Sequence, residues 1–123
     1  MKVAVIGSRK IELDFALLAQ HLPPECSEIV SGGAAGVDRC AAAFARAHNI
    51  RLTEFLPEYN KYGHGAPFIR NRQIVAYADT VLAFWNGRSS GTRSVIQYCA
   101  KIGKACTVVS VFSSTQNISQ TKK

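Results

Sequence analysis

The chain has 123 residues, of which 47% are hydrophobic and 19% charged, and its formal net charge is +7 at pH 7. This length and composition indicate one globular domain and exclude a disordered or fibrous chain. No apolar run approaches the ~18 residues that a membrane span requires. Residues 1–7 are too short for the apolar segment of a secretory leader. We therefore expect a cytoplasmic protein that contacts no membrane.

The positive charge favours an anionic partner. Single-stranded nucleic acid, nucleotides and phosphorylated metabolites would all be attracted. The basic residues are scattered along the chain, so the charge alone does not establish nucleic-acid binding. The four cysteines form no Cys-x-x-Cys pair and have no histidine at metal-ligand spacing. We expect reduced cysteines, no metal site and no cofactor.

Short apolar runs alternate with segments of helical apolar spacing along the chain. The expected strands are 2–6, 28–30, 51–56, 80–85 and 105–112, and the expected helices are 11–22, 39–48, 68–78 and 92–102. This alternation predicts an α/β fold: a single Rossmann-like, doubly wound parallel sheet of five strands, in the order 3-2-1-4-5. The third strand carries two charged residues and is expected near an edge of the sheet.

The Rossmann-like domain is expected to span residues 1–112. Residues 113–123 contain almost no apolar side chains and predict a disordered polar tail. Within the domain, residues 57–67 form the longest irregular stretch. A loop of that length in a compact domain is usually functional or mobile.

The clearest motif is Ser31-Gly32-Gly33-Ala34-Ala35-Gly36-Val37-Asp38, between the second strand and the second helix. Glycines let the backbone approach a ligand closely, and the free N–H groups of a helix start attract phosphate. The N–H groups of Gly32 to Ala35 are therefore the expected phosphate cradle. Asp38 is expected either to hold a ribose hydroxyl or to brace the turn as a first-turn acid. That the glycines serve only packing stays open.

Two further turns have the same character. Gly7-Ser8-Arg9 follows the first strand, and a segment from Asn86 to Thr92 follows the fourth. In the expected strand order, all three loops flank one crevice at the carboxyl ends of the strands. A guanidinium and small hydroxyl side chains beside a helix start suit phosphate or carboxylate.

The helix 68–78 contains Arg70 and Asn71, which are expected to face the same crevice. The predicted ligand-binding residues are Gly7, Ser8, Arg9, Ser31, Gly32, Gly33, Ala34, Asp38, Arg70, Asn71, Gly87, Ser90, Gly91 and Thr92. The chain contains no Gly-x-Ser-x-Gly elbow and no recognisable pair of nucleophile and base. The residues therefore favour binding over catalysis.

Taken in order, these motifs resemble a superfamily over residues 1 to about 110. It joins the Rossmann domain of Smf/DNA-processing protein A with the lonely-guy (lysine-decarboxylase-like) phosphoribohydrolases. The chain is most similar to the small stand-alone members of this superfamily. Their resemblance implies a nucleotide-derived ligand of the ADP-ribose type. It also implies self-association into a homo-oligomer.

The other two branches imply different activities. The phosphoribohydrolases cleave the N-glycosidic bond of nucleoside monophosphates with a Pro-Gly-Gly-x-Gly-Thr-x-x-Glu motif and an arginine, which Arg70 matches. Here Gly91-Thr92 is kept, but Ser94 and Val95 stand where the catalytic glutamate is expected. The DNA-processing branch binds single-stranded DNA and has a similar glycine turn and Arg-Asn-Arg segment.

The favoured hypothesis is binding of a nucleotide-derived phosphate ligand, either ADP-ribose-like or a nucleoside monophosphate. The alternatives are hydrolysis of a nucleoside monophosphate, for which Arg70 would be catalytic, and single-stranded DNA binding. Because the expected glutamate is missing, whether the protein is an enzyme stays open.

Overall fold

The computed structural model describes residues 1–111, so the tail expected at 113–123 lies outside the described residues. Five parallel strands form one sheet in the order β3-β2-β1-β4-β5. This architecture confirms the predicted doubly wound α/β fold and the edge position of the third strand. The strands are β1 (Lys2–Gly7), β2 (Glu28–Ser31), β3 (Arg51–Glu54), β4 (Thr80–Trp85) and β5 (Cys106–Ser110).

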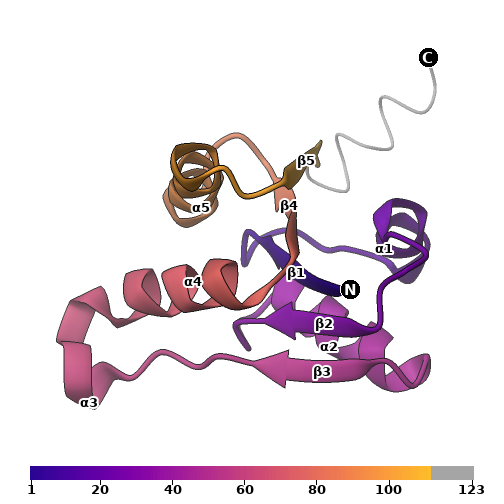
Figure 1. Cartoon of the computed structure of the whole chain (residues 1–123), viewed down its shortest axis with the longest axis horizontal. Coiled ribbons are helices and arrows are strands. Elements are labelled where there is room, and N and C mark those ends of the chain that lie inside the picture. The colour runs from indigo at the N-terminus through magenta and orange to yellow at the C-terminus, as the bar shows by residue number, and fades with distance from the viewer. Residues whose placement is uncertain (112–123) are drawn as a thin grey trace.

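Helices cover both faces of the sheet (Figure 1). The helices are α1 (Phe15–His21), α2 (Val37–Ala47), α3 (Tyr59–Tyr62), η1 (Gly63–Gly65), α4 (Ala66–Tyr77) and α5 (Ser90–Ile102). Helices α1 and α2 pack on one face, and α4 and α5 pack on the other. Crossovers of this kind are what a parallel sheet requires between consecutive strands.

The central strand β1 supplies side chains to both hydrophobic cores. Val3 and Val5 pack against α1 and α2, whereas Ala4 and Ile6 pack against α4 and α5. Alternation along a strand explains this division, because successive side chains point to opposite faces. A strand buried on both faces needs a continuous apolar run, which residues 3–6 provide.

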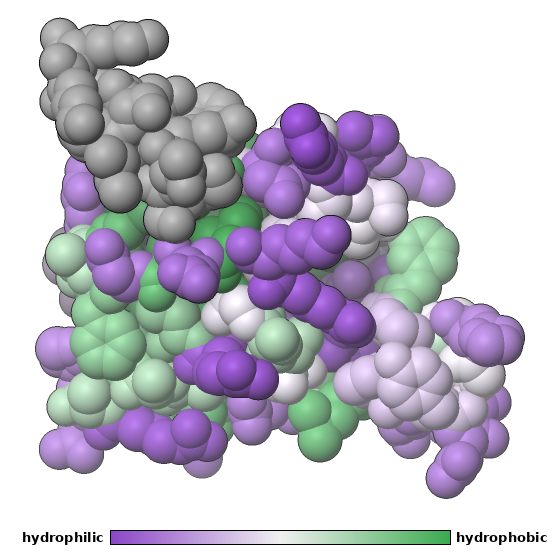
Figure 2. Space-filling model, turned by 180° about the vertical axis from the view of Figure 1, so that it is seen from behind, coloured by the Kyte–Doolittle hydropathy of each residue, from purple (hydrophilic) through white to green (hydrophobic). Residues whose placement is uncertain are grey.

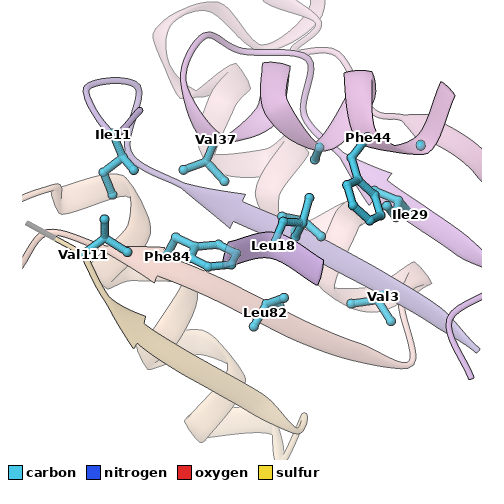
Figure 3. Packing of buried hydrophobic residues seen from close by; sticks show 12 residues of the cluster. Val3, Ile11, Leu18, Ile29, Val37, Phe44, Leu82, Phe84 and Val111 are labelled. Atoms are coloured by element: carbon cyan, nitrogen blue, oxygen red, sulfur yellow. The ribbon is translucent and has the colours of Figure 1, made fainter. Parts of the chain in front are cut away.

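The core between the sheet and helices α1 and α2 contains the largest buried side chains (Figure 3). Leu18 of α1 and Phe84 of β4 have no exposed surface there. Burying a side chain of this size stabilises the fold by about 1.5–3 kcal/mol. Ile11 belongs to the same cluster, although it precedes the helix.

The first helix is shorter than predicted. It begins at Phe15 instead of residue 11, because the carboxylate of Asp14 caps it by accepting a hydrogen bond from the Leu17 N–H (2.8 Å). Ile11 fits the helical apolar spacing although it is not helical. It lies in the loop between β1 and α1, and its side chain is buried.

The stretch 57–67 is also more regular than predicted. It holds the short helices α3 and η1, and α4 begins at Ala66 with Pro67 in its first turn. Proline is favoured there because the first turn of a helix leaves its N–H groups unpaired. At the other end of the domain, α5 begins at Ser90 rather than Thr92, since Ser89 caps it.

The amino ends of the strands are closed by hydrogen bonds. Glu28 accepts hydrogen bonds from the hydroxyls of Tyr77 (2.6 Å) and Thr53 (2.7 Å), which lower the pKa of its carboxyl. Asp79 accepts the N–H of Lys2 at the same end (2.7 Å). These contacts occupy polar groups at the amino ends of the strands, in contrast to the carboxyl ends, where loops surround a cavity.

On the face of the molecule drawn in Figure 2, hydrophilic and hydrophobic residues are interspersed. The exposed large hydrophobic residues come from several elements, including Leu56 and Tyr59 before and in α3, Phe68 in α4 and Val108 in β5. Among residues 1–111, no helix has both the length and the apolar character that crossing a membrane requires.

Candidate functional site

A cavity of about 710 Å³ opens at the carboxyl ends of the central strands. Its walls come from the loops after β1, β2 and β4 and from the inner side of α4. Ten of the predicted residues line it: Gly7, Ser8, Arg9, Ala34, Asp38, Arg70, Asn71, Ser90, Gly91 and Thr92. The structure therefore brings all four sequence motifs to one place, as the strand order requires.

Four predicted residues do not line the cavity: Ser31, Gly32, Gly33 and Gly87. Ser31 is fully buried at the end of β2. A Cβ added at Gly33 would meet the side chain of Leu56 at 2.5 Å, on a surface outside the cavity. The first half of the glycine motif thus serves packing, and its second half reaches the cavity through Ala34 and Asp38.

Ser8 connects the loop after β1 with the loop after β4. Its hydroxyl lies 3.2 Å from the N–H of Lys10 and 3.4 Å from the side-chain amide of Asn86, both of which donate to it. The side chain of Ser8 is almost fully buried. The hydroxyl of Ser8 therefore links two walls of the cavity, and its small, buried side chain fits between the two loops.

Gly36 brings the loop after β2 against the loop after β1. Its backbone has φ 71° and ψ −122°, which a residue with a Cβ rarely adopts. A Cβ there would lie 2.5 Å from the carbonyl oxygen of Arg9 and 2.6 Å from that of Ser8. The next residue, Val37, donates its N–H to the Ser8 carbonyl (3.4 Å). The close approach of these loops requires glycine at position 36.

Asp38 is the carboxylate in the first turn of α2, and only 7% of its surface is exposed. Its Oδ2 accepts a hydrogen bond from the N–H of Ala34 (3.1 Å). Burial raises the pKa of the Asp38 carboxyl, while the Ala34 N–H and the positive charge of Arg70 act in the opposite direction. The aspartate therefore braces the turn and also borders the cavity.

Arg70 reaches from α4 to the end of β2 and is likewise only 7% exposed. Its Nη1 donates to the carbonyl of Gly32 (2.6 Å) and, more weakly, to that of Phe55 (3.3 Å). Its Nε donates to Oδ1 of Asn71 (2.8 Å). A Cβ on Gly32 would lie 2.6 Å from Nη1, so glycine there makes room for the guanidinium.

Burial lowers the pKa of Arg70, and the nearby carboxylate of Asp38 opposes this shift. Among residues 1–111, Arg70 has no carboxylate oxygen within a direct hydrogen bond. Backbone and amide oxygens therefore hold this cation in place. Such a fixed and desolvated guanidinium is well suited to attract an anion, because its orientation costs little further entropy.

The N-terminus of α5 forms the wall at the end of β4. Ser89 caps the helix by accepting the N–H of Thr92 (3.3 Å). Asn86 shapes the turn before it, since its Oδ1 accepts the N–H groups of Arg88 (2.8 Å) and Ser89 (2.9 Å). Ser90, Gly91 and Thr92 then present the first turn of a 13-residue helix to the cavity. Partial positive charge gathers at such a helix start.

Several lining residues are not among the named ligand-binding residues, although Asn86, Arg88 and Ser89 belong to the predicted turn from Asn86 to Thr92: Ile6, Lys10, Ile11, Pro67, Ile74, Asn86, Arg88, Ser89 and Val95. Lys10 and Arg88 adjoin predicted positions, so their place in the loops was a usable signal. Asn86 stands three residues before the capping serine, a spacing typical of a side-chain-capped turn. Ile74 and Val95 face both core and cavity, which no local pattern distinguishes from ordinary core.

The charges that line the cavity are unequal. Arg9, Lys10, Arg70 and Arg88 are basic, and Asp38 is acidic. With the helix start added, the walls favour a ligand that carries negative charge. Within residues 1–111, no group of three or more His, Cys, Asp or Glu lies together as a metal site would need.

No protein-family model matches the chain, and no curated protein matches it. Among solved structures, it is similar to DNA processing protein A from Helicobacter pylori, which was studied for its mode of single-stranded DNA binding. The two share 23% sequence identity at a TM-score of 0.66, over 99% of this chain and 73% of that one. The chain therefore shares a Rossmann-like α/β fold with that structure.

Proposed function

We propose that this chain binds the phosphate of a nucleotide-derived ligand in the cavity at the carboxyl ends of the strands. The observation that carries the proposal is the charge of the walls: among residues 1–111, four of the five charged residues that line the cavity are basic, and the start of α5 lines it too. Exposed Arg9, Lys10 and Arg88 can move to meet the phosphate, and buried Arg70 cannot. Helix starts and arginines are the usual partners of phosphate.

The size of the cavity supports a small molecule. Its volume of about 710 Å³ lies inside the range of about 300–1,000 Å³ that small-molecule sites occupy. A nucleoside monophosphate and an ADP-ribose-like molecule both carry phosphate together with ribose hydroxyls. The cavity offers cations, hydroxyls and one carboxylate for these groups.

Single-stranded DNA is the second candidate ligand. It is favoured by the net charge of +7 and by the similarity to DNA processing protein A. On this alternative, the phosphate site would hold one link of the DNA backbone, and further basic residues would contact its neighbours. Several phosphate contacts would make the affinity fall steeply with salt. The logarithm of the binding constant would fall linearly with the logarithm of the salt concentration, with a slope proportional to the number of phosphate contacts.

Hydrolysis of a nucleoside monophosphate receives less support. Val95, at the position of the expected catalytic glutamate, lines the cavity with an apolar side chain. Asp38 is the one carboxylate among the lining residues of the described chain, and Arg70 is occupied by carbonyl oxygens. Release of free base from AMP, followed by chromatography, would test this activity directly.

Calorimetric titration tests the proposal. We expect AMP or ADP-ribose to bind with one site per chain, and the affinity to fall only modestly between 50 and 200 mM salt, because few phosphates are held. A dT oligonucleotide that binds instead, and loses about 1,000-fold in affinity over that range, would favour the DNA alternative. Absence of binding by all three would contradict the proposed site.

A further inference from the structure

Within the described part of the chain, one carboxylate borders a cavity whose other charged residues are basic. Only 7% of the surface of Asp38 is exposed, and the same holds for Arg70. Both residues line the cavity. A buried carboxylate beside an anion site is costly unless it has hydrogen-bond donors. The Ala34 N–H supplies one donor to Oδ2. A ligand hydroxyl would be a further donor to a group of this kind.

The strand order separates this carboxylate from the proposed phosphate position. Asp38 follows β2, the N-terminus of α5 follows β4, and β1 lies between those two strands. Two strand spacings amount to about 10 Å. The cavity therefore has a carboxylate acceptor, Asp38, beside Arg70 at the β2 end, and the free N–H groups of the α5 start with Arg88 at the β4 end. A ligand that spans it needs an anion at one end and hydrogen-bond donors at the other.

We propose that Asp38 selects ribonucleotides over 2′-deoxyribonucleotides by accepting the hydroxyls of the ribose. This inference rests on the proposed nucleotide site and specifies its ligand class. A ribose presents two neighbouring hydroxyl donors, which the two oxygens of a carboxylate accept together. A deoxyribose presents one hydroxyl there. Hydrogen bonds to a charged group are the stronger ones, so losing one affects affinity measurably.

The test compares AMP with 2′-deoxy-AMP on the full chain by calorimetry at pH 7.5. We expect AMP to bind at least about 10-fold more tightly. In Asp38→Asn, the side-chain oxygen still accepts the Ala34 N–H, so the turn is retained. This variant should lose more affinity for AMP, which donates two hydroxyls, than for 2′-deoxy-AMP, which donates one, and so reduce the preference to within about threefold.

Glu54→Gln is the matched control. Glu54 lies close enough to raise the pKa of Asp38 by repulsion, yet it does not line the cavity. This variant removes one negative charge nearby and should keep the preference for AMP. A loss of the preference in Glu54→Gln would assign the effect to general charge and overturn the role of Asp38.

The remaining outcomes separate this inference from the proposed function. Equal affinity of the wild-type protein for AMP and 2′-deoxy-AMP would overturn ribose selection and leave the nucleotide site standing. An AMP preference that persists in a folded Asp38→Asn protein would overturn the assignment to Asp38. Binding of neither nucleotide would overturn ribose selection, and the proposed function would fall as well only if ADP-ribose also does not bind. If Asp38→Asn fails to fold, the wild-type comparison alone still decides ribose selection.

Discussion

Replacing Gly36 with alanine is expected to destabilise the protein by about 3 kcal/mol or more. The backbone at φ 71° and ψ −122° costs a residue with a Cβ about 1–3 kcal/mol. The new Cβ would overlap the carbonyl oxygens of Arg9 and Ser8, which adds about 1–3 kcal/mol because backbone atoms cannot turn aside. Urea denaturation of both proteins measures the difference.

Gly103→Ala is the control for this variant. Gly103 also has a positive φ, of 76°, but a Cβ there meets no atom within 4 Å. The free energy of unfolding of this variant should therefore fall by only about 1 kcal/mol, from backbone strain alone. If Gly36→Ala costs no more than Gly103→Ala, the tight junction between the loops after β1 and β2 does not stabilise the fold.

The second large effect concerns binding and leaves the fold intact. Gly91 lies in the first turn of α5, lines the cavity, and a Cβ there meets no protein atom within 4 Å. Gly91→Val should therefore change the free energy of unfolding by less than about 0.5 kcal/mol, since the helix propensities of both residues are poor. Its side chain would extend into the space proposed for the phosphate.

Thermal unfolding with AMP measures this effect. At 100 times its dissociation constant, AMP should stabilise the wild-type protein by about 2.7 kcal/mol, and a hundredfold loss of affinity would reduce this to about 0.4 kcal/mol. Ala100→Val is the matched control, because it enlarges an exposed position of α5 outside the cavity. Full stabilisation of Gly91→Val by AMP would mean that the phosphate does not bind against α5.

The sequence was sufficient to predict the strand order and that the loops after β1, β2 and β4 border one cavity. Apolar runs such as residues 3–6 alternate with helical spacing, and right-handed crossovers leave few ways to arrange five parallel strands. Once β1 lies between β2 and β4, the loops that follow them meet at one edge. That is why motifs separated by more than 80 residues could be assigned to a single cavity.

Local patterns were not sufficient for the details, because tertiary contacts decided them. The N–H of Gly32 was expected in a phosphate cradle, yet Gly32 does not line the cavity and instead packs against Arg70, which is 38 residues away and donates to its carbonyl. Ile11 has helical spacing but is buried from a loop, against a core that includes Phe84 and Val111 (Figure 3). Both contacts join residues far apart in the sequence, so no local sequence pattern predicts them.

Backbone amide NMR spectra recorded during a titration with AMP test the central claim most directly. The account predicts that the largest shifts occur at lining residues of the loop after β1, at Ala34 and Asp38, and from Ser89 to Thr92. The amide signals of residues at the amino ends of the strands, such as Glu28 and Thr80, should not shift. Shifts concentrated elsewhere, or none at saturating AMP, would contradict a nucleotide site in this cavity.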